Sequence, residues 1–109
     1  MLSKPEGPGP FPAVVILHTC GGVRSHTSRF WPDVLRQHGY VALTVDSFGS
    51  RGLTPCPNRL IRPGVDYVTE LAPDAFGALD YLASLPGVDK NRIAEIGFSL
   101  GGYVLKSVA

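Results

Sequence analysis

A serine between two glycines is the first feature of this sequence that could carry out chemistry. Residues 97–101 read Gly-Phe-Ser-Leu-Gly, which fits the pattern G-x-S-x-G with Ser99 at its centre. In this pattern a sharp turn exposes the serine hydroxyl as a nucleophile, and the turn is so tight that the residues two before and two after the serine must be small. Gly97 and Gly101 meet that need. The pattern therefore predicts nucleophilic attack by Ser99, the first step of an acyl transfer.

Two other interpretations of this turn have to be weighed. A glycine-rich connection from a strand to a helix can use Ser99 as a plain N-cap. A phosphate-binding loop requires G-x-G-x-x-G or G-x-x-x-x-G-K-[ST], and residues 97–102 read GFSLGG, which matches neither. The nucleophile interpretation is favoured because Ser99 lies where a predicted buried strand passes into a predicted helix.

A second candidate segment, His18-Thr19-Cys20-Gly21-Gly22, follows an earlier apolar run. A serine nucleophile of this kind uses the backbone N–H of the next residue, here Leu100, as one oxyanion donor, and a second N–H from the loop after an earlier strand. We expect the second donor to be the N–H of Cys20, with that of Thr19 as the alternative. His18 is expected to order this loop by hydrogen bonding, in preference to acting as a general base. Nothing nearby marks the Cys20 thiolate as stabilised, so a cysteine nucleophile is not favoured.

Histidines and cysteines show no metal-binding spacing. The three histidines (His18, His26 and His38) lie too far apart in sequence, and neither Cys20 nor Cys56 belongs to a C-x-x-C pair. We therefore predict no metal and no cofactor. Free thiols are favoured over a Cys20–Cys56 bridge, which an exported chain could form. His26 and His38 are expected at the surface, His38 at the C-terminal end of a helix.

Composition excludes several classes of protein. The chain has 109 residues, of which 44% are hydrophobic and 17% charged, with a net charge of +1. Disordered chains have fewer apolar residues and a higher net charge, and nucleic-acid binding needs a basic field. A transmembrane helix needs about 18 consecutive apolar residues, which the chain lacks. The first residues contain no apolar signal segment, so a cytoplasmic protein with a small-molecule partner is the default.

Apolar runs alternate with helical patterns along the chain. The pattern predicts strands at 13–17, 40–45 and 92–98, helices at 28–38, 69–85 and 99–109, a long loop at 47–68, and an extended lead-in without an element at 1–12. Alternating strands and helices are typical of parallel strands joined by right-handed crossovers. The expected fold is a three-layer α/β/α arrangement over residues 13–109, with about three strands and three helices.

Particular side chains are expected to mark the helices. Ser28 is a candidate N-cap, and Gly39 a C-terminal stop. The bulky aromatic residues Phe30, Trp31 and Phe76 are expected in the core. The buried face of the 69–85 helix is predicted to comprise Ala72, Phe76, Leu79 and Ala83.

Asp46, Ser47 and Arg51 follow the second strand, where ligands gather in open parallel sheets. The favoured interpretation is that Asp46 caps the loop and Arg51 is solvated. The other interpretation places both residues, together with His18, at the rim of an active site.

Taken together, these segments resemble the α/β-hydrolase superfamily and, within it, the dienelactone hydrolase family. The resemblance is carried by PAVVILHTCGG, QHGYVALTVDSFGSRG and GVDKNRIAEIGFSLGG, from about Pro12 onward. It implies that the three strands are the third, fourth and fifth of an eight-stranded sheet. It also implies hydrolysis of an ester or lactone through an acyl-enzyme on Ser99. Dienelactone hydrolases proper use a cysteine at this position, so the serine is closer to the serine esterases of the wider family.

The chemistry also needs a base and an acid. In this fold the triad order is Ser, then Asp or Glu, then His, but the ten residues after Ser99, LGGYVLKSVA, contain none of these acids or bases. We therefore expect a partial domain, truncated after the nucleophile turn and inactive as an isolated chain. The alternative is a non-catalytic remnant or interaction module of the same fold. Two bare sheet edges would favour self-association.

Overall fold

The three predicted strand segments form neighbouring strands of one sheet. Strands β2 (Phe11–Leu17), β3 (Val41–Val45) and β4 (Val88–Gly97) follow one another with helical segments between them. The computed structural model describes residues 1–53 and 66–109. In these ranges the strand order is β1-β3-β2-β4, and β2 runs parallel to both of its neighbours. Residues 13–17 of β2 are all buried, as expected for a central strand covered on both faces.

The lead-in forms part of the sheet. Leu2–Ser3 forms the short strand β1, which pairs with β3 in the antiparallel direction through Leu2↔Leu43. The sheet is therefore mixed and has four strands in the described ranges. The prediction that residues 1–12 contain no element is wrong, because a strand of two residues carries no periodic pattern that a sequence could reveal.

The helices begin and end close to the predicted bounds. One π-helical turn, His26–Phe30, leads into α1 (Trp31–Gln37), so the predicted start at Ser28 is wrong by two residues. After α1 the chain turns at Gly39 with a φ of 84°, which confirms the predicted stop. Helix α2 spans Tyr67–Ser84, and α3 spans Leu100–Val108.

Helix α2 begins two residues before the predicted start at residue 69, because Asp66 caps its N-terminus. The Asp66 side chain accepts hydrogen bonds from the backbone N–H groups of Val68 and Thr69, which makes it the N-cap. The Thr69 hydroxyl also donates to the Asp66 carboxylate at 2.7 Å. These bonds lower the pKa of the Asp66 carboxyl, the hydroxyl bond most strongly.

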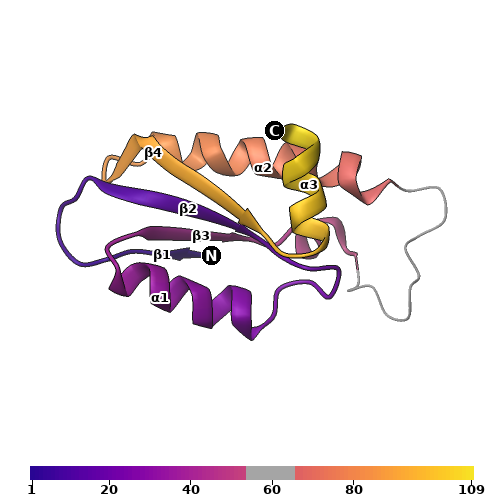
Figure 1. The fold of residues 1–109 in the computed structure, drawn as a ribbon, viewed down its shortest axis with the longest axis horizontal. Coiled ribbons are helices and arrows are strands. Elements are labelled where there is room, and N and C mark those ends of the chain that lie inside the picture. Colours follow the sequence, from indigo (N-terminus) through magenta and orange to yellow (C-terminus); the bar gives the residue numbers. More distant parts are fainter. Residues whose placement is uncertain (54–65) are drawn as a thin grey trace.

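Helices cover both faces of the sheet. Figure 1 shows α2 and α3 on one side of the strands and α1 on the other. The larger core lies under α2, whose buried residues recur at three- and four-residue spacing: Tyr67, Leu71, Ala75, Ala78 and Leu82. The predicted buried face of α2 is wrong for Phe76, which is 53% exposed, and for Ala83, which is also exposed, whereas Leu79 packs partly buried against this core.

A smaller core lies under α1. Val14, Ile16 and Ala42 form it, with Trp31 and Phe98 packed partly buried against them. The core prediction thus holds in part for Trp31 and is wrong for Phe30, which is 58% exposed. No helix in the described ranges is both long and apolar enough to span a bilayer.

Candidate active site

The turn between β4 and α3 holds Ser99 in a strained conformation. Its φ is 52° and its ψ is −107°, and within residues 1–53 and 66–109 no other non-glycine residue has a positive φ. Such a backbone costs on the order of 1–3 kcal/mol and is concentrated at functional sites. The Ser99 side chain is exposed. The turn therefore holds up a hydroxyl at the end of the sheet, as the G-x-S-x-G pattern predicts.

Close backbone contacts explain the two glycines. A Cβ atom on Gly97 would collide with the backbone of Gly101. A Cβ atom on Gly101 would lie 2.5 Å from the Leu17 carbonyl oxygen. Strand β4 can pass into α3 at this angle only because both positions lack a side chain.

The turn is hydrogen-bonded to the end of β2. The Phe98 N–H donates to the Leu17 carbonyl at 3.1 Å, and the Gly101 N–H donates to the His18 carbonyl at 3.2 Å. In the described part of the chain the Leu100 N–H donates to no other group. This N–H opens α3 and carries the positive end of the helix dipole, so it is a donor available to an anion beside Ser99.

The loop after β2 is a tight turn that begins at the strand end to which the Ser99 turn is hydrogen-bonded. The Thr19 carbonyl accepts from the Gly22 N–H at 3.0 Å, and the Thr19 hydroxyl accepts from the Gly21 N–H at 3.1 Å. Cys20, the predicted second oxyanion donor, occupies the bend. It carries no free thiol, so the prediction of a free thiol there is wrong. Cys56 lies outside the described residues.

The bonds of His18 decide its role. The ring is 3% exposed; Nδ1 lies 2.7 Å from the Thr19 carbonyl oxygen, and Nε2 lies 3.1 Å from the backbone nitrogen of Ser47. A carbonyl only accepts and a backbone N–H only donates, so these two bonds call for a proton on Nδ1 and a lone pair on Nε2. Both nitrogens are engaged within the chain. The arrangement favours an ordering role for His18 over a general base.

The other two histidines lie outside this hydrogen-bonded cluster. His38 is exposed, and its Nδ1 lies 2.8 Å from the Val34 carbonyl at the end of α1, which confirms its predicted place. His26 is half-buried and packs edge-on against Phe98, with ring centroids 5.3 Å apart. His26 therefore lies only partly exposed at the surface, against Phe98.

The segment after β3 is tied to α2. Asp46 accepts from the N–H groups of Phe48 and Gly49 at 3.2 and 2.9 Å, which confirms that it caps this loop. Arg51 is exposed, as expected, but its side chain is also bound within the chain. Its guanidinium makes a bidentate pair with Asp74 at 2.7 and 2.9 Å and donates to the Ser47 carbonyl at 2.8 Å. Asp74 was absent from the sequence-based site, because no motif connects it to Arg51.

The pKa values of the Asp74 and Glu95 carboxyl groups are shifted in opposite directions. Burial opposes ionisation of Asp74, but the hydrogen bonds from Arg51 and Ser47 and the Arg51 charge outweigh it, so the pKa of Asp74 lies below its ordinary value. The hydrogen bond to Asp74 raises the pKa of Arg51. On β4, burial raises the pKa of Glu95, whose Oε1 has no hydrogen-bond partner among the described residues.

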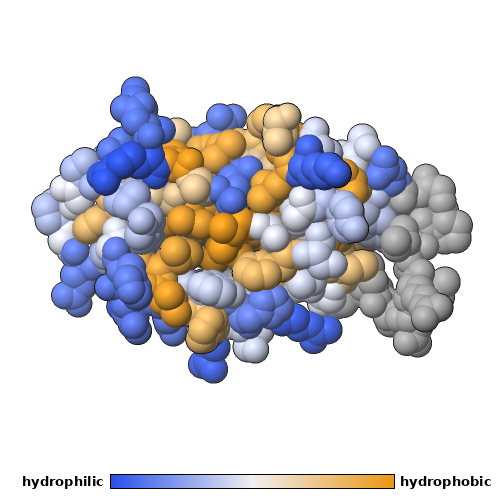
Figure 2. Space-filling view, viewed as in Figure 1, coloured by the Kyte–Doolittle hydropathy of each residue, from blue (hydrophilic) through white to orange (hydrophobic). Residues whose placement is uncertain are grey.

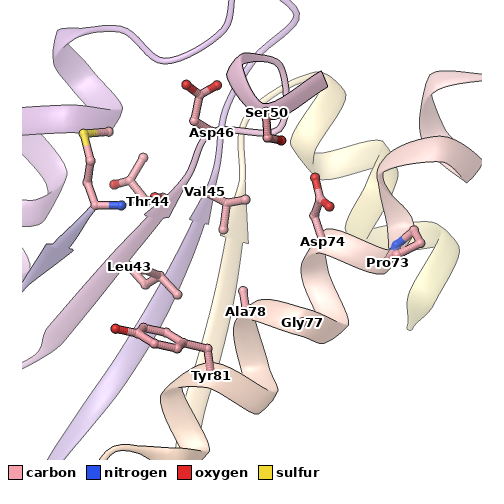
Figure 3. Close-up of a pocket in the computed structure, with 11 residues that line it drawn as sticks. Leu43, Thr44, Val45, Asp46, Ser50, Pro73, Asp74, Gly77, Ala78 and Tyr81 are labelled. Carbon is pink, nitrogen blue, oxygen red and sulfur yellow. Dashed lines mark hydrogen bonds between the residues drawn. The ribbon is translucent and has the colours of Figure 1, made fainter. Parts of the chain in front are cut away.

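The larger hollow near this end of the sheet lies away from Ser99. It has a volume of about 380 Å³ and lies between β3 and α2, with Asp46, Asp74 and Tyr81 among its lining residues (Figure 3). A cavity of only about 10 Å³, lined in part by His18, Ser47 and Leu100, lies beside the turn. Neither is an acyl pocket beside Ser99. Within residues 1–53 and 66–109, no cluster of His, Cys, Asp and Glu side chains is suited to hold a metal ion.

The structure has parallel strands, and a strained serine turn leads from β4 into α3. This turn is hydrogen-bonded to the end of the neighbouring strand β2. Together these features define the α/β-hydrolase fold. A solved structure, that of 2,6-dihydroxy-pseudo-oxynicotine hydrolase, shares this fold. It matches with a TM-score of 0.67 at 23% identity and covers 97% of this chain and 28% of its own. The sequence matches the dienelactone hydrolase family over residues 1–109. The chain therefore belongs to the dienelactone hydrolase family.

Two curated relatives are similar to most of the chain. Uncharacterized protein PA2218 of Pseudomonas aeruginosa is 30% identical over 109 residues, which are 99% of this chain and 28% of that protein. "Putative carboxymethylenebutenolidase" of Synechocystis sp. is 27% identical over 112 residues, covering 95% of this chain and 45% of that protein. The chain thus spans less than half the length of either relative.

Proposed function

We propose that this chain carries the nucleophile and the oxyanion donors of a hydrolase that acts on carboxylic esters or lactones through an acyl-enzyme. The observation that carries the proposal is the strained Ser99, which precedes the free N–H of Leu100 in a turn hydrogen-bonded to Leu17 and His18, where the loop that contains Cys20 starts. Membership of the dienelactone hydrolase family supports the reaction class. The name of the Synechocystis relative supports a lactone as one substrate class.

The proposed reaction has two stages. The Ser99 hydroxyl oxygen bonds to the carbonyl carbon as a base removes its proton, and the carbonyl oxygen becomes an oxyanion held by the N–H groups of Leu100 and Cys20. The oxyanion collapses, the C–O bond to the alcohol breaks, and the alkoxide takes the proton from the base. Water then attacks the acyl-Ser99 ester in the same way and releases the acid.

The base and its supporting acid lie outside the residues that position Ser99. His18 is engaged at both nitrogens, and residues 100–109 contain no Asp, Glu or His. We therefore propose that the 109 residues alone do not turn over an ester. A rim role for Asp46 and Arg51 stays a prediction, and the bonds of Arg51 within the chain favour a structural task.

Activity of a longer chain tests the proposal. Residues 1–109 are continued by a family segment that bears an Asp or Glu and a His, and hydrolysis of short 4-nitrophenyl esters and of a lactone is measured. We expect Ser99→Ala to lower kcat/KM by more than about 10³-fold. The control is Ser107→Ala in the same helix, whose hydroxyl donates to the Val104 carbonyl. A Ser99→Ala variant as active as the parent overturns the proposal.

The alternative is a non-catalytic interaction module of the same fold. This alternative predicts no ester hydrolysis by either chain length and no difference between Ser99→Ala and the parent.

A further inference from the structure

We propose that Asp74 and Arg51 are positioning residues that set the direction of the Cys20 N–H through a relay of hydrogen bonds. The relay runs from α2 through the segment after β3 to the loop after β2. It rests on the proposed function, because that function gives the Cys20 N–H its task.

The relay starts at a half-buried ion pair. The side chains of Arg51 and Asp74 are 29% and 20% exposed, and the pair is bidentate. Figure 3 shows Asp74 projecting from α2 toward the loop that contains Ser50. Arg51 also donates to the Glu70 carbonyl of α2 at 3.2 Å. Both terminal nitrogens of the planar guanidinium are hydrogen-bonded to Asp74, so the group has a fixed orientation that an unpaired arginine lacks.

The next step is the backbone of Ser47. Its carbonyl accepts from Arg51 at 2.8 Å, and its N–H donates to His18 Nε2 at 3.1 Å. Ser47 is therefore held on one side by the ion pair and holds the imidazole on the other. Phe48 packs edge-on against the His18 ring, with centroids 4.7 Å apart, which confines the ring further.

The last step is the peptide group that joins Thr19 to Cys20. His18 Nδ1–H and the Gly22 N–H both donate to the Thr19 carbonyl, at 2.7 and 3.0 Å. In a trans peptide the C=O of one residue and the N–H of the next point in opposite directions. Fixing the Thr19 carbonyl therefore fixes the N–H of Cys20. The imidazole also has to carry its proton on Nδ1, because the other tautomer would face the Thr19 carbonyl with a lone pair.

The tautomer of His18 gives a readout that does not depend on activity. In ¹⁵N-labelled 109-residue chain, long-range ¹H–¹⁵N spectra distinguish an imidazole protonated on Nδ1 from one protonated on Nε2. We expect the parent to show the Nδ1–H form alone. In Arg51→Gln and Asp74→Asn, we expect the Nε2–H form to rise to at least about a tenth of the population. The control Asp89→Asn breaks an exposed pair with Arg92 and is expected to match the parent.

Two outcomes overturn the relay. One is a parent His18 protonated on Nε2, and the other is a pure Nδ1–H form retained in both variants with their fold intact. Where Asp74→Asn or Arg51→Gln fails to fold, Arg51→Lys gives the same readout, because lysine keeps the charge but cannot form the two-pronged pair. Asp89→Asn behaving like the relay variants would also contradict the proposal.

A second measurement links the relay to catalysis in the longer, active chain. His18→Asn keeps an amide donor at the δ position, whereas His18→Gln places its amide at the ε position and leaves the Thr19 carbonyl without that donor. We expect kcat to fall about tenfold or more in His18→Gln and at most about threefold in His18→Asn, with KM little changed. Equal losses contradict the positioning role. If Ser99 proves inert, the proposed function fails, and the tautomer spectra still decide the relay.

Discussion

At the scale of the residue, the site depends on a few atoms that are missing or held in place. Gly97 and Gly101 lack a Cβ at the place where β4, α3 and the end of β2 meet. Between them, Ser99 has a positive φ of 52°. The G-x-S-x-G pattern predicted this arrangement because tight backbone packing permits few residue types. The pair of Arg51 and Asp74 could not be predicted in the same way, since its partners lie 23 positions apart and belong to no motif.

Substituting Gly97 tests the packing of the turn. We expect Gly97→Ala to lower the free energy of unfolding by about 2–3 kcal/mol, because the new methyl group meets the backbone of Gly101. Gly77→Ala is the matched control: nothing lies within 4 Å of its Cβ position, and alanine favours the helix by about 0.5–1 kcal/mol. Urea unfolding measures both. A Gly97→Ala variant as stable as the parent contradicts the geometry.

Titration of Asp74 tests the ion pair. The pKa of Asp74 is lower in the folded chain than its ordinary value, so the pair stabilises the fold above the unfolded pKa of about 3.9. This contribution is lost as the pH falls through the folded pKa. We expect Asp74→Asn to be about 1 kcal/mol less stable than the parent at pH 7, with the difference vanishing once the pH lies below the folded pKa of Asp74. A difference that stays constant with pH rules out the charge of Asp74 as its source.

At the scale of the element, strand and helix order was predictable and the buried face of α2 was not. Apolar runs identified β2 and β3 because residues 13–17 and 41–44 are buried. Strand β4 lies at the edge of the sheet in the described ranges, and after Val88 its residues are only partly buried or exposed. In α2 the size of Phe76 misled the prediction: the small side chains of Ala75 and Ala78 face the sheet instead. A small residue lets a helix approach the strands closely, and only the packed structure shows which stripe does so.

Glu95 gives a prediction for β4. Burial raises its pKa, so the charged form is disfavoured in the folded chain and weakens the fold above the folded pKa. We expect Glu95→Gln to be more stable than the parent at pH 7 by up to about 1 kcal/mol. The gain should disappear as the pH falls below the unfolded value of about 4.3, where both states are protonated. Thermal unfolding at pH 7 and pH 3 measures this, and a gain at pH 3 as large as at pH 7 contradicts it.

At the scale of the whole molecule, one flank of the sheet is apolar and uncovered. Figure 2 shows hydrophobic side chains gathered across the middle of the view. A groove of about 370 Å³ has an apolar lining of Val14, Trp31, Leu35, Ala94, Ile96, Gly97 and Phe98. The described elements place α1 at one side of this groove only. Exposed apolar surface next to a strand edge favours association between chains.

Self-association is the prediction at this scale. We expect the 109-residue chain to form oligomers at concentrations of tens of micromolar by light scattering, and Ala94→Lys to shift it toward the monomer. Ala94 is exposed and lines the groove, whereas Asn91 is exposed and does not, so Asn91→Lys is the matched control. A parent that is monomeric at these concentrations contradicts the expectation.

The nucleophile itself is tested most directly by covalent labelling. A fluorophosphonate that reacts with activated serines is applied to the 109-residue chain and to the longer chain that carries an Asp or Glu and a His, and the adduct is located by peptide mass spectrometry. We predict an adduct on Ser99 in the longer chain, none on its Ser99→Ala variant, and none on the 109 residues alone. An adduct on another serine, or none in the longer chain, would contradict Ser99 as the nucleophile. An adduct on the 109-residue chain would contradict the proposal that these residues do not supply the general base for Ser99.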